Sequence, residues 1–361
     1  MKYKLGEICE IVSGSTPKTT NKEYWDGSVK WITPAELSDE TYIINDSVRK
    51  ITELGVKETG LTPIPKGTVI LSSRAPIGKV AIAGCDLYCN QGFKNLICSD
   101  KINNKYLYWF LKGNTDFLNS LGRGATFKEI SKSIVSEIFI NVPDDITQEK
   151  TVNNLEKINA IIKLRKQELI ELDNLIKARF VEMFGDKYHE ETLLNLCNII
   201  DYRGKTPEKV PEGLPFITAK NIRMHQISLE PREYISKETY DRVMVRGFPK
   251  EGDVVFTTEA PLGNVCRIPH FDTEFYIGQR IVTMQTEKLN PIYLEYALST
   301  EDFRRKYMGK SSGSTVTGIR VRLLEQLTIP VPPNDIQDKF ADFVHQVDKS
   351  KFVVQKVLDS A

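Results

Sequence analysis

Side chains that can read nucleotide bases recur in short segments of this sequence, between runs of β-branched and aromatic residues. Arginine and lysine can donate two hydrogen bonds to guanine, and asparagine and glutamine can pair in a similar way with adenine. Segments between strands are also where binding loops usually lie. In the first half of the chain the candidate DNA contacts are Lys18, Thr20, Lys22, Arg74, Lys79, Asn90, Gln91, Lys94, Arg123, Thr126 and Lys128.

The second half carries a matching set of candidates. They are Arg203, Lys205, Lys220, Asn221, Arg223, Asn264, Arg267, Gln279, Arg280, Lys310, Arg320 and Arg322. Taken alone, each is more often a solvated surface charge than a base contact. As sets they favour nucleic-acid recognition, with phosphate contacts setting register and base contacts setting sequence. Because the two sets differ while the apolar positions match, they predict two different half-sites.

The residue patterns of DNA-acting enzymes are missing. No Asp-x-Lys or Glu-x-Lys occurs, which excludes the usual metal-dependent nuclease motif, and the single Pro-Pro lacks the flanking residues of an adenine methyltransferase loop. The segment around Lys205 lacks the earlier glycine of a phosphate-binding loop, and the four histidines have no metal or triad spacing. We therefore expect no catalytic residue, no metal site and no cofactor in this chain.

Composition describes an ordinary globular protein. Basic and acidic residues nearly balance, 49 against 48, so the chain as a whole lacks the positive charge typical of nucleic-acid-binding proteins. Any basic surface that binds nucleic acid must therefore be local. The six cysteines form no zinc spacing, and Cys9 and Cys197 lie in apolar runs that favour core packing. We find neither an apolar signal core nor a membrane-spanning stretch, so the expected location is cytoplasmic.

The chain contains two copies of one long unit. The matched segments are residues 31–33 with 216–218, 75–78 with 260–263, 124–126 with 313–315, 140–143 with 329–332, and 148–150 with 337–339. Their order is constant and their separation stays between 185 and 190 residues. Solenoid repeats are far shorter, at about 20 to 50 residues, so the copies are whole domains.

Each copy is predicted to be a mixed α+β domain. Short strands are expected at 29–33, 68–72 and 80–83, and again at 214–218, 253–257 and 265–268, because these runs are apolar and bounded by turn residues. A helix should follow Asn103 or Asn104. Its equivalent should follow Asn290, where Pro291 suits the first helical position.

A long helix follows the first domain. Residues 147–183 contain neither proline nor glycine, and a seven-residue spacing joins Leu155, Ile162, Leu169, Ile176 and Met183. That repeat is typical of a coiled-coil seam, whereas a lone surface helix of this length is unusual. Arg165 and Arg179 interrupt the second seam position. We expect them to extend toward solvent or to meet acidic groups on the partner helix.

The second copy ends in a shorter helix of the same kind, with Phe340, Val347 and Val354 spaced by seven. Because a whole domain separates the two helices, they are predicted to pack antiparallel about a pseudo-two-fold axis. The predicted segments are a first domain at 1–143, a long helix at 144–187, a second domain at 188–332 and a shortened helix at 333–361. A shared seam would be roughly 40 to 55 Å long, more than one turn of DNA.

In this order and doubled, the motifs resemble those of the specificity subunit of type I restriction-modification systems. They are LGEI at 5–8, GSTP at 14–17, SRAPIG at 73–78, NQGF at 90–93, GAT at 124–126 with Ile130, and Val142-Pro143 with Gln148. The resemblance covers essentially the whole chain. It implies two target-recognition domains that each read part of a split double-stranded DNA target, and two helices that fix the unread gap.

The same resemblance implies partners. Two modification subunits would dock along the helices and methylate adenine N6 with S-adenosylmethionine, and restriction subunits would use ATP and Mg for cleavage. Two other hypotheses stay open: a self-contained DNA-modifying enzyme with an unfamiliar site, and a structural adaptor that binds proteins at both ends.

Overall fold

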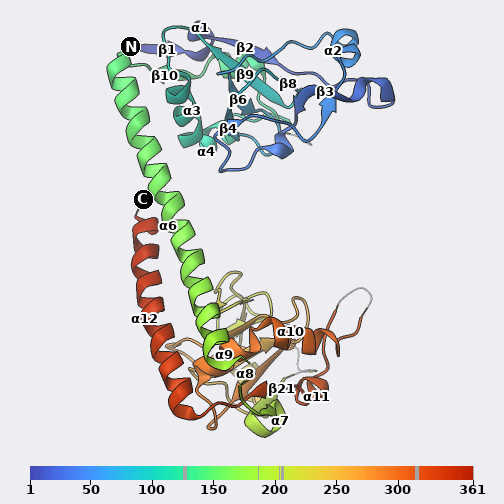
Figure 1. The fold of residues 1–361 in the computed structure, drawn as a ribbon, viewed down its shortest axis with the longest axis vertical. Coiled ribbons are helices and arrows are strands. Elements are labelled where there is room, and N and C mark those ends of the chain that lie inside the picture. Colours follow the sequence, from blue (N-terminus) through green and yellow to red (C-terminus); the bar gives the residue numbers. More distant parts are fainter. Residues whose placement is uncertain (125–127, 186, 203, 205–206, 314–316, 361) are drawn as a thin grey trace. The chain divides into compact units, whose positions relative to one another are not determined.

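The computed structural model divides the chain into two compact units, Met1–Ile162 (unit 1) and Lys163–Ala361 (unit 2). It describes residues 1–124, 128–185, 187–202, 204, 207–313 and 317–360. Both units mix short strands with helices, as the sequence predicts (Figure 1). Among the described residues, no helix is both long enough and apolar enough to cross a membrane.

Unit 1 is built on a five-stranded sheet with the order β2-β9-β6-β7-β4. Its strands are β2 (Cys9–Ser13), β9 (Phe93–Cys98), β6 (Val69–Ser72), β7 (Val80–Ala83) and β4 (Ile43–Ile44). A three-stranded sheet contains β5 (Lys50–Ile51), β3 (Trp25–Ile32) and β8 (Tyr88–Cys89), in that order. A third sheet pairs β1 (Lys2–Lys4) with β10 (Phe139–Asn141).

Unit 2 repeats these three sheets. The order β12-β20-β17-β18 matches β2-β9-β6-β7, the order β16-β13-β19 matches β5-β3-β8, and the pair β11 with β21 matches β1 with β10. The strands are β12 (Asn198–Asp201), β20 (Ile281–Gln285), β17 (Val254–Thr257), β18 (Val265–Arg267), β16 (Tyr234–Ile235), β13 (Leu214–Ile217), β19 (Tyr276–Ile277), β11 (Glu190–Thr192) and β21 (Thr328–Pro330). The predicted duplication is therefore present in strand order as well as in sequence.

One feature distinguishes the two sheets. Unit 1 adds β4 parallel to β7 at the edge of its large sheet. In unit 2 a separate hairpin, β14 (Ile222–Arg223) with β15 (Gln226–Ile227), occupies the corresponding stretch of sequence.

Short helices cover the sheets. In unit 1 they are α1 (Leu5–Ile8), α2 (Glu53–Thr59), α3 (Asn104–Gly113), α4 (Thr115–Ser120) and α5 (Lys132–Ser136). In unit 2 they are α7 (Leu193–Leu196), α8 (Lys237–Val243), α9 (Pro291–Leu298), α10 (Glu301–Met308) and α11 (Val321–Leu324). The predicted caps are confirmed, because Asn103 accepts hydrogen bonds from the Lys105 and Tyr106 amides of α3, and Asn290 accepts from the Ile292 amide of α9.

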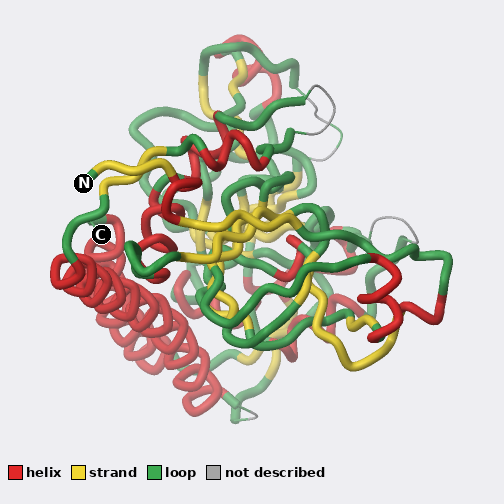
Figure 2. The backbone as a smooth tube through the Cα atoms, turned by 90° about the horizontal axis from the view of Figure 1, so that it is seen from above, coloured by secondary structure: helices red, strands yellow, loops and turns green. Residues whose placement is uncertain are grey.

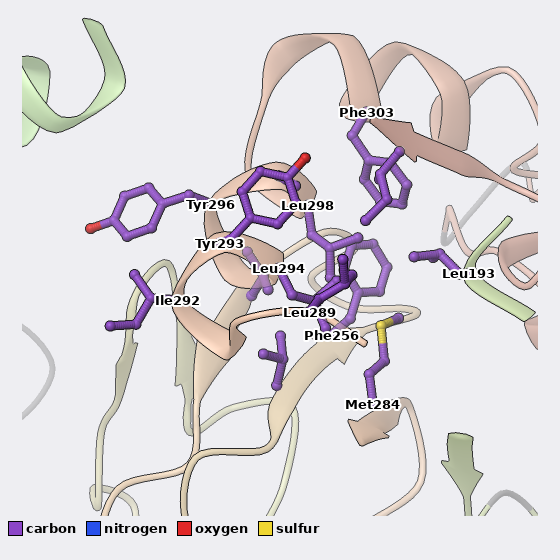
Figure 3. Close-up of a cluster of buried hydrophobic side chains, with 14 of the residues drawn as sticks. Leu193, Phe256, Met284, Leu289, Ile292, Tyr293, Leu294, Tyr296, Leu298 and Phe303 are labelled. Carbon is purple, nitrogen blue, oxygen red and sulfur yellow. The ribbon is translucent and has the colours of Figure 1, made fainter. Parts of the chain in front are cut away.

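The core of unit 2 gathers around α9, in which every residue after Pro291 is buried. Figure 3 shows side chains from α9, β17 and α10, among them Tyr293, Phe256 and Phe303, within this cluster. Phe180 and Phe184 of the long helix join the same core, with Phe184 only 1% exposed. Burial of such aromatic side chains contributes about 2 to 3 kcal/mol each, which anchors this end of the long helix to the domain.

The long helix α6 (Asp145–Phe184) and the helix α12 (Asn334–Asp359) are present as predicted. In unit 2, Phe184 of α6 contacts Phe340, whereas Asp173 forms an ion pair with Lys351 at 2.7 Å. Because the residue number falls along α6 as it rises along α12, the two helices are antiparallel, as expected. Both views show α12 beside this part of α6 (Figure 1, Figure 2).

The seam residues differ in burial along α6. Ile176 is buried, Leu169 and Met183 are half-buried, and Phe340, Val347 and Val354 of α12 are all buried. Leu155 and Ile162 belong to unit 1 and are half-buried. The seam in unit 2 is therefore packed at its predicted α12 positions.

The two arginines that interrupt the heptads extend toward solvent, which is one of the two expected outcomes, because their side chains are 44% and 42% exposed. Arg165 pairs with Glu168 at 2.6 Å and Arg179 with Glu182 at 2.7 Å, so each carboxylate comes from α6 itself. The alternative, an acidic partner on the other helix, is not found among the described residues, and the Arg179 guanidinium instead lies 5.8 Å from the Phe343 ring centroid of α12. One turn of helix brings positions i and i+3 together, which makes this local pairing the cheaper one in side-chain entropy.

Two buried glutamines attach the long helices to their domains. Gln148 accepts a hydrogen bond from the Asn103 amide at 2.8 Å and donates to the Pro143 carbonyl at 3.0 Å. In unit 2, Gln337 makes the equivalent bonds to Asn290 and Pro332, both at 2.8 Å. The repeated glutamine is thus explained by structure, since it satisfies backbone groups at the junction.

Candidate nucleic-acid interface

Four loop segments meet at one end of the large sheet of unit 1, and we call them the unit 1 turn face: residues 13–18, 73–78, 90–92, and the described parts of the hairpin 123–129. The Ser15 amide donates to the Cys89 carbonyl at 3.0 Å, and the Ser73 amide donates to the Gly92 carbonyl at 2.8 Å. Backbone bridges join Glu129 to both Arg74 and Arg123. Strand register therefore brings together segments that are far apart in sequence.

An ion-pair network stabilises the unit 1 turn face. Glu129 accepts from Arg74 at 2.9 Å and from Lys94 at 3.2 Å. Burial tends to raise the pKa of Glu129, but the hydrogen bonds from Arg74 and Lys94 outweigh it and hold that pKa below its usual value. The Lys94 side chain is only 7% exposed, so Glu129 compensates a cation that water barely reaches.

Unit 2 has an equivalent surface, the unit 2 turn face: residues 258–263, 278–280, and the described parts of 312–318. The Thr258 amide donates to the Arg280 carbonyl at 2.8 Å, and backbone bridges join Gly318 to Glu259 and Ser312. These bridges match those of Glu129 in unit 1. Gly318 has no side chain, and the ion pair of this face instead joins Arg280 to Glu259 at 3.6 Å.

Many predicted contacts are exposed in the described structure. They are Lys18, Thr20, Lys22, Arg74, Gln91, Arg123, Lys128, Lys220, Arg223, Arg280, Lys310, Arg320 and Arg322. The structure brings Arg74, Gln91 and Arg123 together on the unit 1 turn face, and Gln279 with Arg280 on that of unit 2. Lys220, Arg223 and Lys310 lie on other segments. Thr126, Arg203 and Lys205 lie outside the described residues.

Other predicted contacts have partners inside the protein. Asn221 is buried and bonds the Thr218 amide and the Ser228 carbonyl, both at 2.9 Å. Lys94 is buried as described, and Lys79 donates to the Leu37 carbonyl at 2.6 Å. The remaining three, Asn90, Asn264 and Arg267, are half-buried and bond to the Gly92 amide, the Ile222 carbonyl and the Glu295 carboxylate, respectively. A polar residue in a turn can satisfy backbone groups as readily as it reads DNA.

Arg49 is an exposed arginine that was not among the predicted contacts. The Arg49 guanidinium lies 3.9 Å from the ring centroid of Trp25 and 5.4 Å from that of Trp31. The signal available in the sequence was Trp31 in the strand predicted at 29–33, Trp25 six positions before it, and a basic pair at 49–50. Nothing local in the sequence indicates that Arg49 reaches those rings, because β5 must first pair with β3.

Among the described residues, no cluster of three or more His, Cys, Asp or Glu side chains could hold a metal ion. The most buried acidic side chain of the described residues is Glu295, 2% exposed, which pairs with His225 at 2.8 Å and Arg267 at 2.5 Å. His225 also stacks on Tyr296. This set binds β18 and the β14–β15 hairpin to α9 and lies within the fold of unit 2.

Two copies of one α/β fold, each with a polar turn face and each joined to a long helix, define a two-domain recognition protein. The chain belongs to the family of the type I restriction modification DNA specificity domain, whose model matches residues 1–174 and again 186–356. The two matches coincide with the duplicated halves. The non-catalytic reading of the sequence agrees with this family.

Known specificity subunits resemble the chain over nearly its whole length. The MjaIX specificity subunit of Methanocaldococcus jannaschii is 26% identical, over 99% of this chain and 90% of that protein. The EcoprrI specificity subunit of Escherichia coli is 22% identical, over 95% and 86%.

Solved structures share the fold. The type I restriction-modification S subunit from M. genitalium aligns with a TM-score of 0.54 at 16% identity, covering 100% of this chain and 92% of that one. A chain from work on complex assembly and conformational transition of the type I R-M system aligns with a TM-score of 0.60 at 18% identity, covering 100% and 95%.

Proposed function

We propose that this chain is the DNA sequence-specificity subunit of a type I restriction-modification complex, and that each unit reads one half of a bipartite double-stranded target through its turn face. Phosphate contacts would set the register, and exposed side chains such as Gln91 and Arg123 would read base edges. The observation that carries the proposal is the doubled specificity-domain match on two units with the same strand order.

In this proposal the chain itself uses no cofactor. Two modification subunits dock on the helices α6 and α12 and transfer a methyl group from S-adenosylmethionine to adenine N6, and restriction subunits use ATP and Mg. Exposed apolar side chains on the helices support docking, since Leu164, Ile170, Phe352 and Val353 are each at least 53% exposed. The near-zero net charge suggests weak DNA binding by the chain alone.

Methylation mapping tests the proposal. Single-molecule sequencing of host DNA should reveal a split adenine-methylation motif that disappears when the gene is deleted and returns with the gene on a plasmid. Purified chain that methylates or cuts DNA unaided would favour the self-contained enzyme. An assembled complex without sequence preference would favour the adaptor.

A second arm of the same experiment tests the spacing role of α6. Removing one heptad between Leu155 and Met183 shortens a helix by about 10 Å, or roughly 3 base pairs of DNA, and should shorten the unread gap. The half-site sequences should stay the same because the turn faces are untouched. An unchanged gap in the methylated motif contradicts this role.

A further inference from the structure

Two tryptophans in unit 1 form a platform beneath the loop that carries Lys18 and Lys22. Trp25 and Trp31 meet edge to face, with ring centroids 5.2 Å apart. The Trp31 indole N–H donates to the Ser15 carbonyl at 3.0 Å, and that of Trp25 donates to the Lys18 carbonyl at 3.3 Å. Both indole donors are therefore spent on holding the loop, which leaves the ring faces to interact with something else.

The Arg49 side chain lies on that platform. Its guanidinium is 3.9 Å from the Trp25 centroid, close enough for stacking, while the side chain as a whole is exposed. Within the described part of the chain, none of the ion pairs involves Arg49, although Glu23 and Asp26 lie in the same region of sequence. A stacked guanidinium keeps its N–H donors free at the plane's edge. Arg49 is thus an ordered cation with unused donors.

The equivalent position in unit 2 has the opposite charge. Arg49 immediately precedes β5, and Glu233 immediately precedes β16, which pairs with β13 as β5 pairs with β3. Glu233 is bound to Lys209 at 2.7 Å, and Phe216 replaces Trp31. Among the described residues of unit 2 the cation nearest this ring is Lys209, 5.8 Å from the Phe216 centroid and paired with Glu233, so the shared fold does not require an unpaired arginine here.

We propose that Arg49 binds a backbone phosphate of the half-site read by unit 1, with Lys18 and Lys22 beside it. This inference rests on the proposed DNA-reading function and adds a contact that the fold alone does not assign. A phosphate is favoured because a guanidinium offers donors alone, and the exposed Lys18 and Lys22 of the adjoining loop add positive charge. The rigid fork of arginine suits two phosphate oxygens at once.

The test uses the chain assembled with its methyltransferase partner and two duplexes of equal length, one with the methylated motif and one scrambled. Arg49→Ala should weaken binding to both duplexes by about tenfold, the loss expected for a charged hydrogen bond. The slope of log affinity against log salt should become shallower by about 0.9, the value for one phosphate. Arg49→Lys keeps the charge, so its slope should match the wild type.

Lys101→Ala is the matched control, because Lys101 is an exposed cation of unit 1 that lies over the Tyr3 ring, outside the cluster around Trp25 and Trp31. It should leave the slope unchanged, and thermal unfolding of each variant shows that unit 1 is intact. A loss confined to one base pair of the motif overturns the phosphate assignment. An unchanged slope for Arg49→Ala in a complex that still prefers its motif also overturns it, whereas a wild-type complex without preference contradicts the proposed function instead.

Discussion

The two units share a backbone and differ in charge at matched positions. Where unit 1 has Arg74 and Glu129 on its turn face, unit 2 has Glu259 and Gly318 at the same backbone bridges. Ahead of the matching strands β5 and β16, the charge changes again, from Arg49 to Glu233. Strand pairing and buried apolar residues hold the fold, so the charge of a turn residue can change sign while the backbone stays the same. A chain that reads two different half-sites needs a fold that does not depend on the residues in its turns.

The largest expected difference concerns one glycine in the turn of each unit. Gly78 and Gly263 both have φ near +92°, and an added Cβ would meet the Thr115 methyl in unit 1 but the buried Tyr307 ring and hydroxyl in unit 2. Gly263→Ala should lower the free energy of unfolding by about 4 kcal/mol and Gly78→Ala by about 2 kcal/mol. Both substitutions strain the backbone, but only the buried Tyr307 side chain has no room to move away from the added Cβ. Calorimetric unfolding of each variant measures this.

Gly60→Ala is the control for strain alone, because Gly60 has φ of +62° and its added Cβ would meet nothing within 4 Å. It should cost about 1 kcal/mol. Equal losses at Gly78 and Gly263 would show that the two turns have the same surroundings after all.

The glutamine junctions should behave alike in both units. Gln148→Ala and Gln337→Ala each leave a partly buried backbone amide, of Asn103 or Asn290, without its acceptor. Each substitution should lower the free energy of unfolding by about 2 kcal/mol. Amide hydrogen exchange at the start of α3 and α9 should accelerate by a similar factor. A large effect in one unit only would mean that the repeated motif has different roles.

Sequence patterns predicted the fold well because they are local. Heptads located α6 and α12, and Asn103 and Asn290 located two helix starts within a residue. The candidate contacts were harder, since the side chains of Asn221 and Lys94 have the right chemistry but are buried. Asn221 bonds backbone groups three and seven residues away, and Lys94 pairs with Glu129, 35 residues away. Arg49 was missed because its stacking on Trp25 depends on the pairing of β5 with β3, which no local pattern shows. Exposure and pairing depend on strand register, which a single sequence does not show.

The ion-pair networks of the turn faces give the next prediction. Glu129→Gln leaves the buried Lys94 cation with weaker compensation and should cost about 1 to 2 kcal/mol. Glu259→Gln loosens a longer, more exposed pair with Arg280 and should cost less than about 0.5 kcal/mol. Urea unfolding of both variants checks the ranking. Equal losses of stability would indicate that the buried Lys94 cation does not need the Glu129 carboxylate.

Acid should remove the contribution of Glu129. Its pKa is lowered in the folded state, so its stabilisation is complete above the ordinary value of 4.5 and is lost as pH falls through the lower folded value. The stability difference between the wild type and Glu129→Gln should therefore be constant from pH 7 to about 5 and shrink below about 4.5. Urea midpoints at several pH values measure it, and a difference that persists at pH 2 would contradict the assignment.

The smallest effect compares how α6 is attached in each unit. In unit 1, Glu156 accepts from Lys105 at 2.9 Å and from the Tyr42 hydroxyl at 2.5 Å; the Tyr42 bond is the main reason that the pKa of Glu156 is lowered. In unit 2, Asp173 has a single half-exposed ion pair with Lys351. Glu156→Gln should cost about 1 kcal/mol, and Asp173→Asn about 0.3 kcal/mol or less. Because salt screens exposed charges more than it weakens a hydroxyl bond, 1 M NaCl should abolish the second loss and leave much of the first. If Asp173→Asn proves the costlier change, polar contacts must hold the helix pair of unit 2 together, and the apolar seam through Ile176 and Phe340 would be the weaker part.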